Sequence, residues 1–243
     1  MLLAVTGASG KTGWRVVQEA LARGHRVRAL VRPGSDVPAG LQGAELVRLE
    51  LSDGPALANA LQGCEALVIA TGARPGIDLT APLRVDAWAV GSQIRACEAL
   101  GVKRVLLVSS LCAGLLWHPL NLFGLILVVK RLGEQALERS SLDWTIIRPG
   151  GLTESETGLE QQTIHYSNTD QQQDGSIPRR LVARVCLDAL ETPLSHNRII
   201  EITSRHPAAA ASKSSNRETN NAVKFAAPSE TSVRSLSNWL TES

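Results

Sequence analysis

Short apolar runs that alternate with helical patterns restrict the fold of this sequence more than any other feature. The runs are rich in Val, Ile and Leu and lack a polar face, which is typical of strands buried inside a parallel sheet. They lie at residues 2–5, 26–31, 45–49, 66–69, 105–108, 145–147 and 199–202. Helical periodicity covers residues 13–22 and 86–100, and Gly24 and Gly101 follow these helices as left-handed caps. The alternation predicts a doubly wound α/β fold with a parallel sheet.

The chain length of 243 residues suits one large domain followed by a tail. We expect the domain to cover residues 1–204, with a small substrate lobe at about 151–178. From residue 205 to residue 243 the sequence is of low complexity and poor in large apolar side chains, so we expect disorder there. Leu236, Trp239 and Leu240 have helical spacing and could dock on the domain or on a partner, but a frayed terminus is the expectation.

Charge and cysteine usage exclude several classes of function. Charged residues make up 20% of the chain and the net charge is +2, which gives no reason to expect nucleic acid as a partner. Four cysteines lie far apart without metal-ligand spacing, so we expect neither a metal site nor disulfides. The first strand starts at the amino terminus and leaves no room for a signal peptide. We therefore expect a cytosolic protein, with contact to a membrane surface as the alternative.

A glycine-rich loop follows the first strand and opens the first helix. Its sequence is GASGKTG, at residues 7–13. The first glycine permits a tight turn, the second lets the backbone approach a pyrophosphate, and the third lets helix and strand pack closely. In this strand–turn–helix context the loop predicts a dinucleotide site, whereas a ligand-free turn is the alternative. The expected phosphate ligands are Gly7, Ser9, Gly10, Lys11, Thr12 and Gly13.

The end of the second strand indicates which dinucleotide is bound. It carries Arg32, where NAD-binding folds commonly place an acidic residue on the ribose hydroxyls. A guanidinium suits a 2′-phosphate, and Lys11 could close on the same phosphate, unless both are solvated surface cations. Asp53 could accept from the adenine amino group, or cap a short helix predicted at 56–61, or do both. We expect NADP(H) as the cofactor.

Several motifs along the chain point to one known family. They are the loop at 7–13, VLLVSS at 105–110, HPLN at 118–121, the Lys130–Arg131 pair followed by Glu134, and WTIIRPGGL at 144–152. With these motifs, residues 2–204 resemble the atypical short-chain dehydrogenase/reductases of plants and cyanobacteria, an NmrA-like group. The resemblance implies a Rossmann domain that binds NAD(P)(H). Several members of that family are linked to photosynthetic membranes, pigment metabolism, or flavin and bilin reduction.

The proton donor that short-chain reductases normally use is missing. In that family a Tyr-x-x-x-Lys pair protonates the carbonyl oxygen and holds the nicotinamide ribose. Lys130 matches the lysine, but Ile126 stands at the tyrosine position, and the single tyrosine of the chain is Tyr166. The resemblance implies that Lys130 contacts the ribose with Glu134 as its partner one turn later, whereas an exposed cation is the alternative. Ordinary alcohol dehydrogenation is not expected.

The ends of the later strands should line the crevice in which a doubly wound sheet binds its ligand. Leu111 stands where extended members of the family carry the active-site serine, and Ser110 precedes it. Tyr166 lies in an alternating stretch at 163–167, a strand of the substrate lobe, where we expect it to pack rather than react. The strand-end residues expected to contact the cofactor are Thr71, Gly72, Ser109, Pro149, Gly150 and Gly151.

An uncharged stretch from Leu111 to Val129 is nearly long enough to cross a bilayer. A spanning helix is not expected, because Pro119 and polar neighbours interrupt the stretch and it starts from a sheet strand. It either covers the crevice as a packed loop and helix, or it forms a hydrophobic pocket or a surface for a membrane or a partner, anchored by Trp117 and Phe123. His118 is the candidate catalytic proton donor, or else a hydrogen-bonded corner.

Two functions fit these features. The first is an NADPH-dependent reductase of a small apolar or conjugated acceptor, such as a flavin, bilin, quinone or pigment, because such acceptors take a hydride without a tyrosine acid. The second is a non-catalytic NADP-sensing scaffold that contacts a protein partner through the apolar stretch and the tail. An epimerase or dehydratase would need a tyrosine-type acid and is disfavoured.

Overall fold

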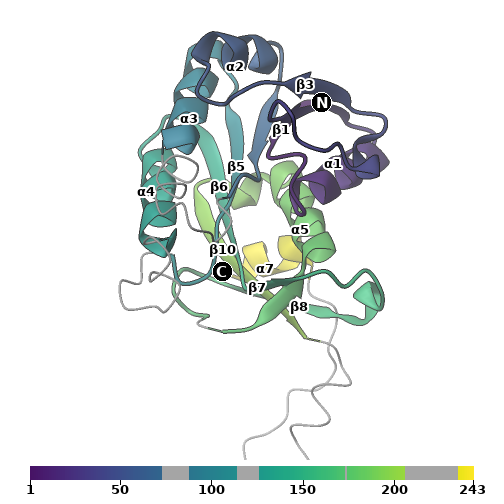
Figure 1. Cartoon of the computed structure of the whole chain (residues 1–243). Coiled ribbons are helices and arrows are strands. Elements are labelled where there is room, and N and C mark those ends of the chain that lie inside the picture. Colours follow the sequence, from purple (N-terminus) through teal and green to yellow (C-terminus); the bar gives the residue numbers. More distant parts are fainter. Residues whose placement is uncertain (73–87, 114–125, 173, 206–234) are drawn as a thin grey trace, which may run out of the picture.

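A ten-stranded sheet forms the centre of the molecule (Figure 1). The computed structural model describes residues 1–72, 88–113, 126–172, 174–205 and 235–243. The strand order is β3-β2-β1-β4-β5-β6-β10-β9-β7, and β8 pairs with β10. The strands are β1 (Leu2–Thr6), β2 (Arg26–Val31), β3 (Glu45–Arg48), β4 (Ala66–Ile69), β5 (Arg104–Val108), β6 (Asp143–Pro149), β7 (Gly151–Thr153), β8 (Thr163–Ser167), β9 (Ser176–Pro178) and β10 (Arg198–Arg205).

The first six strands and β10 run parallel, as the predicted doubly wound fold requires. Strands β8 and β9 run antiparallel to β10, and β7 extends the sheet beyond β9. These three short strands lie within or next to residues 151–178. The prediction of a doubly wound domain with a small additional lobe is confirmed for the fold.

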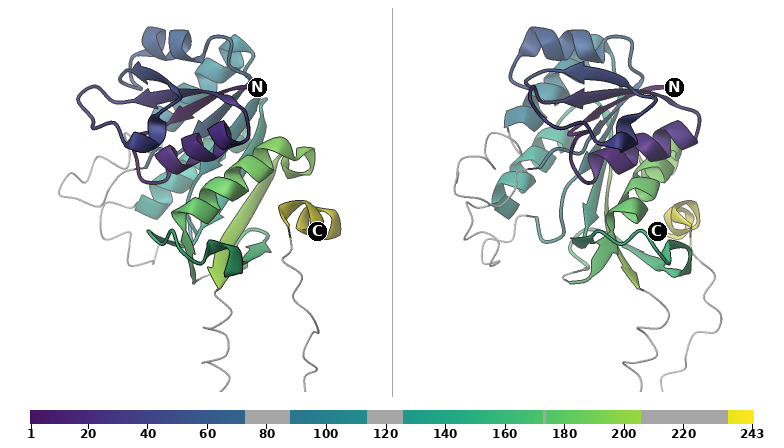
Figure 2. Two further views of the ribbon diagram at one scale, coloured as in Figure 1. Left: turned by 90° about the vertical axis from the view of Figure 1, so that its right-hand side faces the viewer. Right: turned by 45° about the vertical axis from the view of Figure 1, so that its right-hand side comes forward.

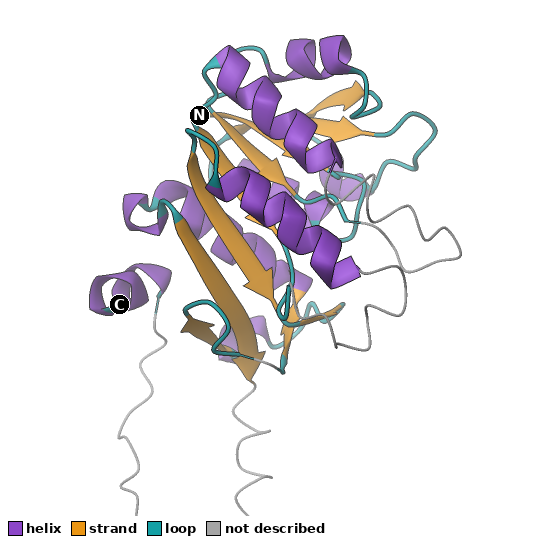
Figure 3. Ribbon diagram, turned by 90° about the vertical axis from the view of Figure 1, so that its left-hand side faces the viewer, coloured by secondary structure: helices purple, strands orange, loops and turns teal. Residues whose placement is uncertain are grey.

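Helices cover both faces of the sheet (Figures 1 and 3). On one face lie α1 (Gly13–Ala22) and α5 (Arg179–Glu191), and on the other lie α2 (Gly54–Leu61), α3 (Ala89–Leu100) and α4 (Ile126–Glu138). Single turns of 3-10 helix occur at η1 (Ala39–Leu41), η4 (Leu159–Gln161) and η5 (Pro193–Ser195). The result is a three-layer sandwich.

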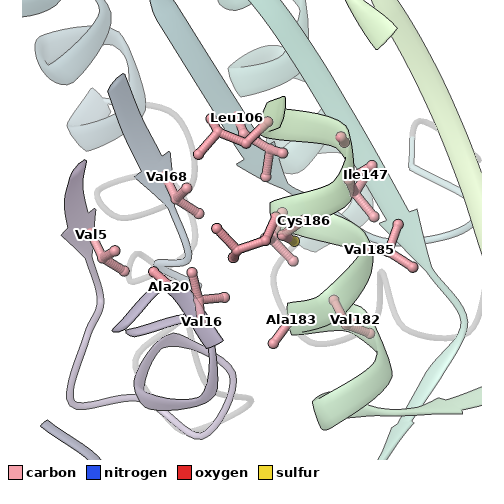
Figure 4. Packing of buried hydrophobic residues seen from close by; sticks show 14 of the residues in the cluster. Val5, Val16, Ala20, Val68, Leu106, Ile147, Val182, Ala183, Val185 and Cys186 are labelled. Atoms are coloured by element: carbon pink, nitrogen blue, oxygen red, sulfur yellow. The ribbon is translucent and has the colours of Figure 1, made fainter. Parts of the chain in front are cut away.

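Two apolar cores fill the space between the layers. Figure 4 shows the first, in which Val16 of α1 and Val182 and Cys186 of α5 pack against Val68 and Leu106 of the sheet. The second lies under α2, α3 and α4 and contains Leu57, Leu61, Ile94, Cys97 and Leu137. Burial on both faces is the reason that the central strands lack a polar side.

Strand β3 differs from its prediction. The run at 45–49 reads as a buried strand, yet β3 is the edge of the sheet and its side chains are mostly exposed, Leu46 at 41%. An edge strand has a neighbour on one side only, and apolar composition alone does not distinguish it from a central strand. The helix predicted at 86–100 begins at Ala89 in the described chain, and residues 86 and 87 lie outside the described residues.

The C-terminus forms a docked helix, so the expected frayed end was wrong. Helix α7 (Leu236–Glu242) lies beside α5 (Figure 2). Its Leu236, Trp239 and Leu240 are 1%, 8% and 3% exposed, and the Trp239 ring stacks on Tyr166 of β8 at 5.9 Å between centroids. Ser235 caps the helix by accepting the amide hydrogen of Asn238. Residues 206–234 of the predicted tail lie outside the described residues.

Three further observations concern the described part of the chain. No helix there is both long and apolar enough to span a bilayer. No group of three His, Cys, Asp or Glu side chains among those residues is placed to hold a metal ion. All four cysteines are buried, and none of them forms a disulfide.

Candidate functional site

The glycine loop between β1 and α1 has two positions that exclude a side chain. Gly7 has φ +69°, and a Cβ there would lie 2.7 Å from the carbonyl oxygen of Ala70. A Cβ on Gly13 would lie only 2.1 Å from the carbonyl oxygen of Gly7. The turn therefore needs a glycine at its first position, and close packing of α1 needs one at its last.

The backbone of this loop presents free donors. The amide of Gly10 donates to the Gly7 carbonyl oxygen at 2.8 Å, and the α1 ladder begins with Trp14. The amides of Ser9, Lys11 and Thr12 donate no hydrogen bond to any described residue. Such a helix N-terminus, with its amides directed outward, is suited to bind phosphate.

Two buried hydroxyl groups without partners lie at the same edge of the sheet. Thr71 follows β4 and Ser109 follows β5, and both strands run parallel to β1. Neither hydroxyl oxygen has a hydrogen-bond partner among the described residues, although both are buried. A buried polar group without a partner costs about 1–3 kcal/mol. A polar ligand bound at this edge of the sheet would satisfy both, so the residues present fit a dinucleotide.

Gly150 and Gly151 make backbone contacts with neighbouring segments that the sequence analysis did not predict. Their amides donate to Ile202 at 2.9 Å and to Gly175 at 2.8 Å. A Cβ on Gly150 would lie 2.6 Å from the Gly175 carbonyl oxygen. These glycines therefore join β6 to the strands of the lobe. Together with Pro149 and Gly72 they lie at the carboxyl ends of parallel strands, and their contact with a cofactor stays a prediction.

Arg32 stands at the head of a tight turn. Gly34 has φ +74°, and both the amide and the hydroxyl of Ser35 donate to the Arg32 carbonyl oxygen, at 3.2 and 2.8 Å. Arg48, at the end of β3, donates to the Ser35 carbonyl oxygen at 3.1 Å. The turn thus connects the end of β2, which carries Arg32, to the end of β3, which carries Arg48. Sequence reasoning missed Arg48, although it ends the third strand as Arg32 ends the second.

Lys11, which is expected to clamp a phosphate together with Arg32, pairs with a carboxylate in this structure. Its ammonium nitrogen pairs with Glu154, just after β7, at 3.0 Å, and β7 lies at the opposite end of the sheet from β2. Arg15 of α1, which is buried, pairs with Glu154 at 3.2 Å and also with Glu156. The hydrogen bond from Lys11 and the nearby arginines hold the pKa of Glu154 below its ordinary value. A phosphate role for Lys11 stays a prediction.

The remaining predicted residues have separate surroundings. Asp53 caps α2 by accepting the amide hydrogen of Ala56 at 3.0 Å, which confirms the capping role and leaves adenine contact as a prediction. Tyr166 is packed on Trp239, and burial raises its pKa far above the ordinary value, so it is no proton donor near neutral pH. His118, Trp117 and Phe123 lie outside the described residues.

A network of buried charged side chains includes Glu134, which follows Lys130 by one turn of α4. One turn after Lys130, the carboxylate of Glu134 is fully buried and accepts two hydrogen bonds from Arg148 of β6, at 2.9 and 2.7 Å. Glu134 also accepts from Arg131 at 3.1 Å. Glu201 of β10 is the register neighbour of Arg148 and lies 3.5 Å from it.

Glu201 also organises the lobe. Its carboxylate accepts the amide hydrogens of Asp170, Gln171 and Gln172 at 2.8, 3.0 and 2.9 Å. Sequence reasoning missed both Arg148 and Glu201. The signal that could have revealed them is a charged residue directly after a pair of isoleucines in each of two strands, which is rare inside a sheet without a partner.

Comparison with known proteins agrees with this geometry. A family model described as NAD(P)H-binding matches residues 7–193. The chain is 36% identical over 216 residues to an uncharacterised chloroplastic protein of Arabidopsis thaliana, covering 83% of this chain and 76% of that protein. It is 29% identical over 240 residues to sanguinarine reductase of Eschscholzia californica, covering 83% and 88%.

A solved structure shows the same fold. It is a putative NAD-dependent epimerase/dehydratase from Bacillus halodurans, with a TM-score of 0.76 and 29% identity. The match covers 88% of this chain and 99% of that chain.

Proposed function

Because the chain belongs to the NAD(P)H-binding family, we propose that it is an NADPH-dependent reductase of a flat, apolar or conjugated acceptor. The observation that supports this most is the meeting of a glycine loop with free amides and two buried hydroxyls without partners, Thr71 and Ser109, at one edge of the sheet. Loop amides suit phosphates, and the hydroxyls suit the polar groups of a nicotinamide nucleotide.

Each part of the cofactor has candidate ligands on this chain. The loop amides of residues 9–12 would hold the pyrophosphate, and Lys130 the nicotinamide ribose. Thr71 and Ser109 would donate to polar groups deeper in the crevice. When bound, NADPH supplies the hydride. The protein's own contribution is to align cofactor and acceptor and to exclude water from the crevice.

NADP(H) is proposed over NAD(H) because cations, not carboxylates, end the second and third strands. Arg32 is exposed and makes no ion pair with any described residue, so its charge is available to a 2′-phosphate. Arg48 fixes the turn that carries Arg32 through its bond to Ser35. A planar guanidinium with several donors matches a phosphate better than the ribose hydroxyls of NAD.

The acceptor class follows from the missing acid. The only tyrosine of the chain is packed against Trp239, so no phenol is available for a carbonyl substrate. A conjugated acceptor spreads the incoming charge and takes its proton from solvent or from a group such as His118. Sanguinarine reductase, a relative of similar length, supports the reductase over the epimerase suggested by the name of the Bacillus halodurans structure.

The cysteines and the apolar stretch bear on the location and the partners of the protein. The buried reduced cysteines suit a reducing compartment, which is the cytosol or, by analogy with the chloroplastic Arabidopsis relative, the chloroplast. The apolar stretch from Leu111 to Val129 is proposed to meet the acceptor, a membrane surface or a protein partner. Its residues 114–125 lie outside the described chain.

The first test is fluorescence titration of the purified protein with NADPH and NADH, followed by NADPH oxidation with FMN, a soluble quinone and biliverdin. Tight NADPH binding with turnover of one acceptor is expected. Binding without turnover on all of them would favour a cofactor-sensing scaffold instead. Absence of binding would overturn the proposal.

A second test uses the buried hydroxyl of Ser109. Ser109→Ala removes a buried hydroxyl that has no partner, so the free energy of unfolding should stay the same or rise. NADPH binding should weaken about 3- to 10-fold, because a hydrogen bond to the cofactor is lost. A variant that is destabilised without a change in NADPH affinity would contradict the assignment.

A further inference from the structure

Two carboxylates lie against the cations beside the glycine loop. Glu154 and Glu156 belong to the segment that connects β7 to η4. Glu154 contacts Lys11 at 3.0 Å and also Arg15 and Arg179, at 3.2 and 3.1 Å. Glu156 pairs with Arg15 and, at 3.0 Å, with Arg180. Four cations thus share two carboxylates, which leaves positive charge in excess next to the loop.

The Lys11–Glu154 pair is the exchangeable part of this cluster. Both of its side chains are well exposed, at 63% and 49%, whereas the Arg15 side chain is 6% exposed. Lys11 stands in the loop between Gly10 and Gly13, among amides that have no acceptor in the described chain. A carboxylate oxygen 3.0 Å from its ammonium nitrogen therefore takes a place that suits a phosphate oxygen.

We propose that Glu154 competes with the cofactor's phosphates for Lys11 and thereby lowers the affinity of the site for NADPH. This inference rests on the proposed function. When an anionic cofactor enters, Lys11 exchanges Glu154 for phosphate, and Glu154 keeps Arg15 and Arg179 as partners. Glu156 holds the segment through Arg15 and Arg180, so the segment stays attached. Glu154 thus lowers the affinity of the cofactor site by a modest factor.

The test is Glu154→Gln, with the dissociation constant for NADPH measured by fluorescence titration. An exposed ion pair contributes little, so we expect binding about two- to fivefold tighter at low salt. The gain should shrink as ionic strength rises, because salt screens exposed charges. Glu160→Gln is the matched control, since Glu160 follows the segment directly, in η4, but pairs with Arg184 and is 82% exposed. It should leave the constant unchanged.

A second variant isolates the role of Lys11. In a Lys11→Met background, Glu154→Gln should no longer tighten binding through competition. Unchanged or weaker NADPH binding by the single Glu154→Gln variant would overturn the inference, as would an equal gain in both backgrounds. If the unaltered protein bound no NADPH at all, the proposed function would fail with it. Thermal unfolding of each variant shows that it is folded.

Discussion

Arg32 differs in its surroundings from the four cations that lie beside Glu154 and Glu156. Lys11, Arg15, Arg179 and Arg180 each contact Glu154 or Glu156, whereas Arg32 makes no ion pair with any described residue. A positive charge without a counterion is suited to a dianionic 2′-phosphate and gains little from a neutral ribose. The preference for NADP(H) should therefore depend on this residue.

Arg32→Asp should reverse that preference. We expect NADPH binding to weaken at least about tenfold, because a favourable charge pair becomes a repulsive one, and NADH binding to change little or improve. Titration with both cofactors measures this directly. Arg26→Asp is the control, since Arg26 is an exposed residue at the amino end of the same strand. Equal NADPH/NADH ratios in the unaltered protein and in Arg32→Asp would remove the argument for Arg32.

Gly13 should tolerate no side chain. A Cβ there would lie 2.1 Å from the Gly7 carbonyl oxygen, so Gly13→Ala must push α1 away from β1. Overpacking of this kind typically costs about 1–3 kcal/mol of unfolding free energy, and the displaced loop should lose NADPH affinity as well. Gly54→Ala is the control, because nothing lies within 4 Å of its Cβ position. Urea unfolding that shows equal stability for the two variants would contradict the geometry.

At the scale of elements, Arg148 joins three parts of the chain. It reaches Glu134 of α4, Glu201 of β10 and Asp170 of the lobe from its own place in β6. Removing it would leave the carboxylate of Glu134 without its main partner and would take from the carboxylate of Glu201 its ion-pair partner, and both carboxylates belong to residues that are 0% exposed. The network therefore ties the helix that bears Lys130 to the strands under the lobe.

Arg148→Met should cost about 3–5 kcal/mol of unfolding free energy, which is typical when one partner of a buried ion pair is lost. Urea unfolding measures the loss. Arg184 of α5 is partly exposed and pairs with Glu160. Arg184→Met should therefore cost less than about 1 kcal/mol of unfolding free energy. A similar cost for the two substitutions would mean that the buried network contributes no more than a surface pair.

Acid should loosen the segment that carries Glu154 and Glu156. The hydrogen bond from Lys11 lowers the pKa of Glu154, and for Glu156 the bonds from Arg15 and Arg180 outweigh the opposite effect of burial. Folded-state pKa values below the unfolded ones give stability that is present above about pH 4.3 and is lost as pH falls through the folded values. The Glu154→Gln, Glu156→Gln double variant should lose less stability between about pH 5 and about pH 2 than the unaltered protein.

Local patterns in the sequence were enough to predict the parallel strands β1 to β6 and β10, the glycine loop and the helix cap at Asp53, because each depends on neighbours a few residues away. The pairing of Arg148 with Glu201 depends instead on strand order, which places residues 53 positions apart in register. The same holds for Lys11, whose partner Glu154 comes from the far end of the sheet. Edge position also escaped prediction, since β3 resembles the central strands in composition.

For the molecule as a whole, the last residues complete the packing of the domain. Helix α7 covers α5 and the ring of Tyr166, and Arg198 of β10 donates to Ser243 at 2.9 Å. Three spaced apolar residues indicated a helix, but they did not reveal the surface that receives it. That surface comes from α5 and β8, which are separate in sequence. The sole tyrosine thus belongs to the structural interior and not to the crevice.

Trp239→Ala should undock α7. The ring is 8% exposed and stacks on Tyr166, so its removal leaves a cavity beneath a helix of only seven residues. A Trp→Ala change in a core costs about 3–5 kcal/mol of unfolding free energy. Here the loss cannot exceed the free energy with which α7 docks, because the helix detaches once that energy is lost. We expect a loss of about 2–4 kcal/mol in urea unfolding and faster amide exchange in α7.

Trp88→Ala is the control. Its side chain is 65% exposed, so its removal should cost less than about 1 kcal/mol of unfolding free energy. Equal losses at the two tryptophans would show that the docked helix adds nothing to the stability of the domain.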